Sequence, residues 1–335
     1  MKTIRWAIIG LGRFGAVHAS AIKSMGGSEL VAVCNRNEEK LAHLSKNLGS
    51  VATHSDYRSI LQSPDVDAVS ITTHWREHYE IAAAALHSGK HVFLEKPMAA
   101  SSIECDDLLQ IAKQSPGFLM IGHVCRFDPR AVLAREAILR NEIGQVVSMH
   151  AKRNLPQAPG HIRLDKISPL MGDGIHDADL MMWFTQQRPS RVFARNVKFS
   201  EFKYPDLGWA MLEFGDQTVG VIETVWCLPE NSPTTIDAKL EVIGTNGKLT
   251  VDCSHTGFHI VSDSGINMPD TVYWPEIHGR RTGALVNELT SFAECIRNNR
   301  QPEIITPDEA AAAVKVMEAA ESSAASGNPV DISWT

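Results

Sequence analysis

The sequence predicts an α/β protein: a doubly wound parallel sheet in the N-terminal part, then an α+β domain with a large, mainly antiparallel open sheet. Three observations support this expectation. The chain has 335 residues, more than one hydrophobic core usually holds. Short apolar runs alternate with helix-like segments before residue 123, and period-two alternation dominates after it. We therefore expect two domains, at residues 1–123 and 124–335.

The N-terminal elements follow a strand–helix alternation. Short apolar runs predict strands at 4–9, 30–33, 68–72, 91–94 and 118–122. Helices are expected between and after them, at 15–25, 38–49, 57–62, 77–88 and 102–114. Each helix ends near a glycine or a proline, as a helix stop should.

The C-terminal elements change in character. A helix is expected first, at 130–141, and then strands at 146–153, 190–199, 209–214, 219–226, 238–244 and 248–252. Turn signals at Gly215-Asp216 and Thr245-Asn246-Gly247 favour antiparallel pairing, in a sheet with one face left for a partner subunit. Two helices close the chain, at 283–298 and 307–326, the second beginning with Thr306 as its N-cap and Pro307 as its first residue.

Composition excludes several classes of protein. With 32 basic and 39 acidic side chains the formal charge is −7, which disfavours nucleic acid and anionic membranes as partners. The six cysteines form no C-x-x-C pair, so we expect a reducing, cytoplasmic setting. No apolar stretch reaches the roughly 20 residues of a membrane span, and glycines and Arg13 interrupt the first apolar run, which we interpret as a strand and not a leader.

A glycine motif follows the first expected strand. In Gly10-Leu11-Gly12-Arg13-Phe14-Gly15 the first glycine permits a tight turn, the second lets a pyrophosphate approach the backbone, and the third allows close helix packing. Such turns also occur for structural reasons alone. At the first strand–helix junction of a βαβ pattern, however, the motif predicts a dinucleotide site at a helix N-terminus.

The end of the second strand bears on the choice of cofactor. An NAD site usually has an acidic residue there, and this chain has Asn35-Arg36. Asn35 can bond a ribose hydroxyl, and Arg36 can stack on adenine or pair with a 2′-phosphate, or it is an ordinary solvated arginine. NAD and NADP both remain open.

The end of the fourth strand carries Glu95-Lys96-Pro97, where a lysine faces the ligand crevice unless it lies in a surface loop. Together with the glycine motif, this segment resembles the Gfo/Idh/MocA oxidoreductases, the family of glucose-fructose oxidoreductase and inositol 2-dehydrogenase. Further matching segments are Thr73 with His78, Gly122-His123 with Arg126-Phe127, and His176-Asp177. The resemblance covers nearly the whole chain. It implies a Rossmann domain, a second domain for substrate binding and oligomerisation, and oxidation or reduction of a carbinol carbon.

The resemblance also implies roles for single residues. Lys96 would bond the reacting hydroxyl, and His176 would exchange its proton, because imidazole titrates near neutral pH. In the family an aspartate stands four residues before the histidine, whereas this chain has Gly172 there and Asp173 one residue later. Asp173 is therefore an expected but displaced catalytic partner, and a structural role for His176 at the start of a helix is the alternative.

The remaining site residues are expected from the same motifs. The cofactor is expected to contact Gly10, Gly12, Arg13, Phe14, Gly15, Asn35, Arg36, Thr72, Thr73, His74, His78, Glu95 and Lys96. His74 departs from the family's proline. The substrate is expected to contact Lys96, Arg126, Arg153, Asn154, His161, Arg163, Asp173, His176 and Trp226, by polar groups and an aromatic face. The acids and histidine at 173–179 lack a second ligand cluster, so no metal site is expected.

The sequence thus predicts an NAD(P)-dependent oxidoreductase that transfers a hydride between nicotinamide and a ring carbinol of a sugar or inositol-like cyclitol. We expect a homodimer or homotetramer formed through the open sheet. Two other functions stay open: a dehydrogenase of a nucleotide-linked amino sugar, and a non-catalytic protein that senses the cofactor. Intact Glu95-Lys96-Pro97 and His176 argue against the second of these.

Overall fold

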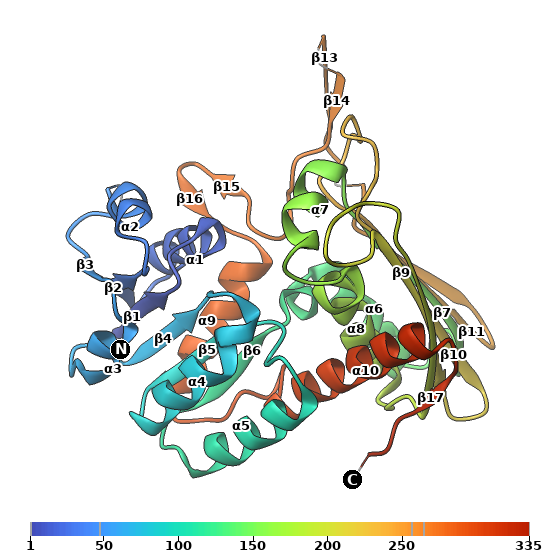
Figure 1. Cartoon of the computed structure of the whole chain (residues 1–335), viewed down its shortest axis with the longest axis horizontal. Coiled ribbons are helices and arrows are strands. Elements are labelled where there is room, and N and C mark those ends of the chain that lie inside the picture. The colour runs from blue at the N-terminus through green and yellow to red at the C-terminus, as the bar shows by residue number, and fades with distance from the viewer. Residues whose placement is uncertain (1, 47, 256, 264, 335) are drawn as a thin grey trace. The chain divides into compact units, whose positions relative to one another are not determined.

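The computed structural model describes residues 2–46, 48–255, 257–263 and 265–334 (Figure 1). Its contacts divide the chain into two compact units. The first unit contains the residues up to Asp128 together with Val272–Ala311, and the second contains Pro129–Thr271 and the residues from Ala312 onward. The segment Val272–Ala311 thus packs with the N-terminal sheet, although the sequence places it far away.

The first unit is built on the expected parallel sheet. Its strands are β1 (Ile4–Ile9), β2 (Ser28–Cys34), β3 (Ala52–His54), β4 (Ala68–Ile71), β5 (His91–Glu95) and β6 (Leu119–Gly122). The strand order is β3-β2-β1-β4-β5-β6, and every pair is parallel. The order reverses between β1 and β4, which makes that crevice the ligand edge of a doubly wound fold. The short strand β3 has no counterpart in the sequence analysis, because only three residues form it.

Helices cover both faces of this sheet. They are α1 (Arg13–Ser24), α2 (Glu38–Ser45), α3 (Tyr57–Gln62), α4 (His78–His87), α5 (Ser102–Gln114) and α9 (Ala284–Arg297), with short 3-10 turns η1 (Trp75–Glu77) and η2 (Val124–Phe127). Residue 47, which the sequence analysis includes in the second helix, lies outside the described residues. Helix α9 contacts α1, β1 and β5, and the Phe292 ring lies 6.0 Å from Trp6 and 6.1 Å from Phe93. The returning segment therefore completes the core of the first unit.

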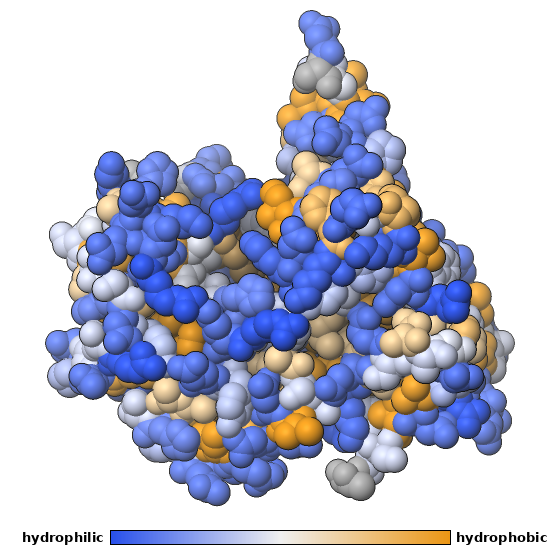
Figure 2. All heavy atoms as spheres, viewed as in Figure 1, coloured by the Kyte–Doolittle hydropathy of each residue, from blue (hydrophilic) through white to orange (hydrophobic). Residues whose placement is uncertain are grey.

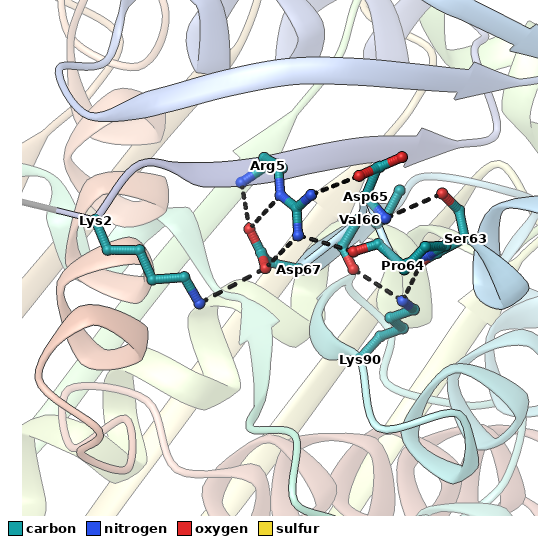
Figure 3. Close-up of polar contacts among 8 residues, drawn as sticks. All are labelled: Lys2, Arg5, Ser63, Pro64, Asp65, Val66, Asp67 and Lys90. Atoms are coloured by element: carbon teal, nitrogen blue, oxygen red, sulfur yellow. Dashed lines mark hydrogen bonds and ion pairs between the residues drawn. The ribbon is translucent and has the colours of Figure 1, made fainter.

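A polar cluster fastens the amino ends of β1 and β4, away from the ligand edge (Figure 3). Arg5 binds Asp67 through its backbone N–H at 2.9 Å and its side chain at 3.1 Å, and Lys2 approaches the same carboxylate. Burial acts to raise the pKa of Asp67, but the hydrogen bonds from Arg5 and the charge of Lys2 lower it below its ordinary value. Lys90 donates to the carbonyls of Ser63 and Val66. This cluster stabilises the sheet and leaves the opposite edge for function.

The second unit contains the expected open sheet. Its strands are β7 (Val146–Asn154), β8 (Arg191–Val197), β9 (Leu207–Phe214), β10 (Thr218–Val225), β11 (Asp237–Gly244), β12 (Lys248–Asp252) and β17 (Val330–Asp331). The order is β12-β11-β7-β10-β9-β8-β17, with β7 and β10 parallel and the other pairs antiparallel. Both expected turns join neighbouring strands, at Gly215 between β9 and β10 and at residues 245–247 between β11 and β12.

Helices cover one face of the second sheet. They are α6 (Pro129–Leu139), α7 (Gln157–Leu164), α8 (Ile175–Thr185) and α10 (Pro307–Ser326), and a π-helical turn η3 (Leu170–Gly174) leads into α8. Helix α7 was not expected from the sequence, since Pro159 and Gly160 obscure its pattern. Gly220 of β10 allows α8 to approach the sheet closely, since a Cβ there would lie 2.6 Å from the Met181 sulfur.

Two small hairpins complete the chain. Strands β15 (Glu276–Ile277) and β16 (Arg280–Arg281) belong to the first unit, and β13 (Ile260–Ser262) and β14 (Gly265–Asn267) form an exposed arm of the second. Hydrophobic atoms lie on this arm below its hydrophilic tip (Figure 2). No helix in the described part of the chain is long and apolar enough to cross a membrane.

Candidate functional site

The three glycines of the turn after β1 have different structural requirements. Gly10 has a φ of +100°, and a Cβ there would lie 2.7 Å from the Thr73 backbone nitrogen. A Cβ on Gly15 would lie 2.4 Å from the Gly10 carbonyl oxygen. The fold of the turn itself therefore requires glycine at both positions. Gly12 has a φ of −98°, and a Cβ there would meet, among the described residues, only the Gly10 oxygen at 3.9 Å. Packing leaves open space beside Gly12.

Helix α1 starts at this space. Gly12 is its N-cap, and no side-chain cap satisfies the first N–H groups of the helix within the part of the chain described. Arg13 is exposed and Phe14 is half-buried in the first turn. A helix N-terminus with unsatisfied N–H groups favours an anionic ligand, because the backbone donors and the helix dipole both point toward it.

The carboxyl ends of β1, β4 and β5 bring the expected residues to one edge. Ile9 pairs with Ile71 and Ile71 with Leu94, so the segments that follow β1, β4 and β5 leave the sheet at the same edge. Thr72 Oγ1 donates to the Gly10 carbonyl at 2.9 Å. Thr73 Oγ1 is buried, and the described residues offer it no hydrogen-bond partner. The turn and the loop after β4 thus line the same edge, and they include a polar atom that a ligand can satisfy.

Lys96 emerges at this edge between two constrained residues, and the Lys96–Pro97 peptide is cis. The Glu95 side chain is mostly buried, and His18 Nε2 from α1 lies 3.2 Å from its Oε1. On the other side, His78 Nδ1 lies 2.6 Å from the Pro97 carbonyl oxygen. Burial lowers the pKa of His78, while the hydrogen bond to Pro97 acts in the opposite direction. The sequence analysis overlooked His18, although its position on the inner face of the first helix after the glycine motif was a usable signal.

Asn35 and Arg36 are both occupied by protein partners. Asn35 Nδ2 donates to the Leu11 carbonyl at 2.7 Å, and Asn35 Oδ1 accepts from the Asn37 N–H at 2.8 Å. Asn35, which follows β2, therefore stabilises the glycine turn by a hydrogen bond. Arg36 forms an ion pair with Glu77 of η1, with an exposed guanidinium. The carboxylate offsets the positive charge that the sequence analysis considered for a 2′-phosphate.

In the second unit, the start of α8 gathers the expected polar residues. His176 and Asp173 are 7% and 6% exposed. Trp226 Nε1 donates to Asp173 Oδ2 at 3.0 Å, and Arg163 Nη1 lies 3.2 Å from the same oxygen. A Cβ on Gly172 would lie 2.6 Å from the Trp226 ring, so no larger side chain fits where the family has its aspartate. Asp173 lies one residue later, within the π-helical turn, a type of turn that is frequent at functional sites.

Other residues expected to bind substrate have structural partners. Arg153 forms a buried bidentate pair with Asp177, at 2.8 and 3.2 Å, which fastens β7 to α8. Asn154 donates to Glu223 at 2.7 Å and accepts from the Val225 N–H at 2.8 Å.

The last two expected substrate residues differ from each other in burial. Arg126 is 1% exposed and belongs to the first unit, where it binds the Ile304 carbonyl at 2.8 Å and Glu309 at 3.1 Å. His161, which is half-buried, packs its ring 4.8 Å from Phe202. Among the described residues, no group of three or more His, Cys, Asp or Glu side chains can hold a metal ion.

The residues present fit a dinucleotide. The space at Gly12 has the place of a pyrophosphate site, the N-terminus of α1 supplies donors, and Thr73 Oγ1 is a buried polar atom that lacks a partner among the described residues. The parallel sheet, its order reversal and this turn together define a dinucleotide-binding oxidoreductase of the Rossmann type.

Comparison with known proteins specifies the family. Residues 4–123 match the model of the oxidoreductase family with an NAD-binding Rossmann fold, GFO/IDH/MocA. Residues 132–250 match the C-terminal domain of the same family. The chain belongs to the GFO/IDH/MocA oxidoreductases, as the sequence analysis expected.

Individual relatives extend over almost the whole chain. The chain is 29% identical to scyllo-inositol 2-dehydrogenase (NAD(+)) of Bacillus subtilis over 338 residues, 98% of this chain and 96% of the relative. Its fold is similar to scyllo-inositol dehydrogenase from Lactobacillus casei with bound NAD(H) and scyllo-inositol, with a TM-score of 0.84, 23% identity and 99% of each chain covered. It is also similar to GenD2 from gentamicin A biosynthesis in complex with NAD, with a TM-score of 0.89, 24% identity and coverage of 100% of this chain and 97% of that one.

Proposed function

We propose that this protein is an NAD-dependent dehydrogenase that oxidises a ring carbinol of an inositol-like cyclitol or a sugar. NAD, held at the glycine turn after β1, would supply the acceptor for the hydride of the carbinol carbon. The C–H electron pair leaves with the hydride, the hydroxyl loses its proton, and a ketone results. The observation that carries the proposal is the lysine turn at the carboxyl end of β5, on the same edge of the first sheet as the open space at Gly12.

Lys96 has the chemistry to hold the reacting oxygen. Its ammonium donates hydrogen bonds, and it stabilises negative charge on the oxygen as the hydroxyl proton leaves. Glu95 and Pro97 on either side of it are fixed by buried contacts, so the lysine emerges from a rigid turn. We assign Lys96 as the residue that binds the hydroxyl.

On the second unit, we assign His176 as the group that exchanges the hydroxyl proton and Asp173 as its acidic neighbour. Both are nearly buried at the start of α8. Trp226 and Arg163 hold the Asp173 carboxylate, so its charge is stabilised where it stands. Arg163, half-exposed, remains a substrate contact in this proposal, whereas Arg126, Arg153 and Asn154 support the structure.

The Arg36–Glu77 pair favours NAD over NADP. A 2′-phosphate would have to compete with Glu77 for the guanidinium and would meet the carboxylate charge. The relative from Bacillus subtilis is named as an NAD(+) enzyme, which agrees with this preference.

A cyclitol is the favoured substrate class because inositol dehydrogenases recur among the relatives. A nucleotide-linked amino sugar is the second substrate class to test.

The test is a screen by absorbance of the reduced nicotinamide. NAD and NADP are each offered with myo-inositol, scyllo-inositol, free sugars and a nucleotide-linked amino sugar. Lys96→Ala should lower kcat by roughly 10²- to 10⁴-fold with the fold intact. Lys113→Ala, on the exposed last turn of α5, is the matched control. Full activity of Lys96→Ala would refute the assignment of Lys96. Binding of NAD without turnover of any polyol would refute the proposed reaction and favour a cofactor-sensing protein.

We also propose that copies of the chain pair through the outer face of the second sheet. The side chains that point away from α8 include large exposed apolar ones: Trp209 at 40%, Met211 at 38%, Val219 at 38% and Ile243 at 44%. An apolar surface of this kind on an open sheet marks an association site. Met211→Lys should lower the mass measured by light scattering during gel filtration, whereas Val261→Lys on the β13–β14 arm should not.

We place the protein in the cytoplasm. Four of the six cysteines, Cys34, Cys105, Cys125 and Cys295, are buried. Burial raises the pKa of the Cys34 thiol to about 11, with the charge of Asp56 acting in the same direction, which keeps it unreactive. Thiols in this state suit a reducing compartment.

A further inference from the structure

Two buried imidazoles contact the residues on either side of Lys96. His18, on α1, is fully buried, with Nε2 at 3.2 Å from Glu95 Oε1 and Nδ1 at 2.9 Å from Ser70 Oγ. Among the described residues Nε2 has no hydrogen-bond partner, so it approaches the Glu95 carboxylate without bonding to it, whereas Nδ1 and the Ser70 hydroxyl share a hydrogen bond. His18 thereby connects α1, β4 and the end of β5.

His78, at the start of α4, makes the contact on the other side. It is 1% exposed, and its Nδ1 lies 2.6 Å from the Pro97 carbonyl oxygen. A carbonyl only accepts, so Nδ1 is the protonated nitrogen. The sequence analysis expected His78 to contact the cofactor, but its burial and this hydrogen bond give it a partner within the protein.

Both contacts resist movement of the lysine turn. Glu95 is a nearly buried carboxylate, and a Cβ on Gly122 would lie 2.7 Å from its Oε1, so the carboxylate fills a fitted space. Moving it away would separate it from the buried His18 ring and leave an unfilled space beside Gly122, which has a packing cost. Moving Pro97 would break the bond to His78.

We propose that His18 and His78 are positioning residues that hold the backbone on both sides of Lys96 and so fix its ammonium group for catalysis. The inference rests on the proposed role of Lys96. It also connects the cofactor turn to the lysine, since His18 lies on the helix that begins at Gly12 and its ring contacts Phe14 at 4.8 Å.

The test exploits the different ring nitrogens with which the two histidines face the residues beside Lys96: Nε2 of His18 faces Glu95, and Nδ1 of His78 faces Pro97. The amide nitrogen of glutamine matches the reach of Nε2, and that of asparagine matches Nδ1. We therefore expect His18→Gln and His78→Asn to keep kcat within about threefold of wild type. His18→Asn and His78→Gln should lower kcat by about 10- to 100-fold, since a displacement near 1 Å can have an effect of this size. KM for NAD should change little, because the glycine turn is not altered.

A second readout does not depend on turnover. Lysines are reductively methylated with ¹³C, the Lys96 signal is identified by its loss in Lys96→Ala, and its titration midpoint is followed by NMR. The midpoint should move in His18→Asn and His78→Gln and stay near the wild-type value in the other two variants. His91→Asn is the control, because His91 is a partly buried histidine at the opposite end of β5 whose Nδ1 accepts from the Phe118 N–H.

The outcomes separate this inference from the proposed function. Equal kcat and an unmoved Lys96 midpoint in all four variants would overturn the positioning role, and so would equal tolerance of both amides at each position. If the wild type turns over no polyol but the midpoint moves as expected, the positioning role is supported and the proposed reaction fails.

Discussion

The substitution Gly12→Ala tests whether glycine is required at this position for cofactor binding or for folding of the protein. The new methyl group would meet only one described atom, at 3.9 Å, on a backbone that alanine adopts readily. The free energy of unfolding should therefore change by less than about 0.5 kcal/mol, the usual range for a substitution without a packing cost. The same methyl occupies the space where the pyrophosphate would lie.

The effect on binding follows from overpacking. Forcing a methyl into a close contact costs about 1–3 kcal/mol. At 1.4 kcal/mol for each factor of ten, NAD should bind roughly 10- to 100-fold more weakly to Gly12→Ala. The wild type and the variant should nevertheless have nearly equal melting temperatures in the absence of NAD.

The neighbouring glycines are the matched controls. Gly10→Ala combines a φ of +100° with a contact of 2.7 Å to the Thr73 nitrogen, and Gly15→Ala brings a Cβ to 2.4 Å from a carbonyl oxygen. Each should lower the free energy of unfolding by about 2–5 kcal/mol. In a domain of this size that lowers Tm by about 5–15 °C.

Isothermal titration with NAD and thermal melting of the apo proteins give both quantities. An unchanged Kd in Gly12→Ala would show that the open space is not where the pyrophosphate binds. A fall in Tm as large as that of Gly10→Ala would show that packing, and not the ligand, requires glycine there.

Three further predictions concern ion pairs and hydrogen bonds. Glu77→Gln should release Arg36 from its ion pair and lower KM for NADP by about three- to tenfold, while KM for NAD changes by less than twofold. An unchanged ratio of kcat/KM for the two cofactors would contradict this role of Glu77. Asp67→Asn should lower the free energy of unfolding by about 1–3 kcal/mol at neutral pH, measured in urea. Because the folded pKa of Asp67 is depressed, this difference should fade as the pH falls through that lowered pKa, and a difference independent of pH would refute the ion-pair explanation. Trp226→Phe removes a hydrogen bond to the buried Asp173 and should cost about 1–3 kcal/mol, whereas wild-type stability would show that solvent replaces the indole.

Local pattern was sufficient for most of the fold. The strands that begin at Ile4 and Val146 and the helix that begins at Ser102 have strong periodicity, and the structure confirms them. The short strand β3 and helix α7 could not be predicted, because their stability comes from tertiary packing and not from their own sequence. The parallel pairing of β7 with β10 likewise depends on contacts between strands distant in sequence.

The sequence could not show which of the expected site residues form hydrogen bonds or ion pairs within the protein. Motifs locate the glycine turn and Lys96, because their spacing encodes the chemistry. They do not show that Asn35 is bonded to the glycine turn, or that Arg153 is paired with Asp177 inside the second unit. A side chain's partner is decided by the folded backbone, so these residues looked available for ligands in the sequence.

The return of α9 to the first sheet sets an order of events on the ribosome. Trp6 and Phe93 emerge early, yet Phe292, which packs against both, is made about 170 residues after the last N-terminal segment of that unit. At 5–20 residues per second this is a delay of roughly 10–30 s. Throughout that interval the nascent sheet has an uncovered aromatic surface, so a trigger-factor-like holdase should bind it, and a fragment that ends at residue 128 should aggregate when it is expressed alone.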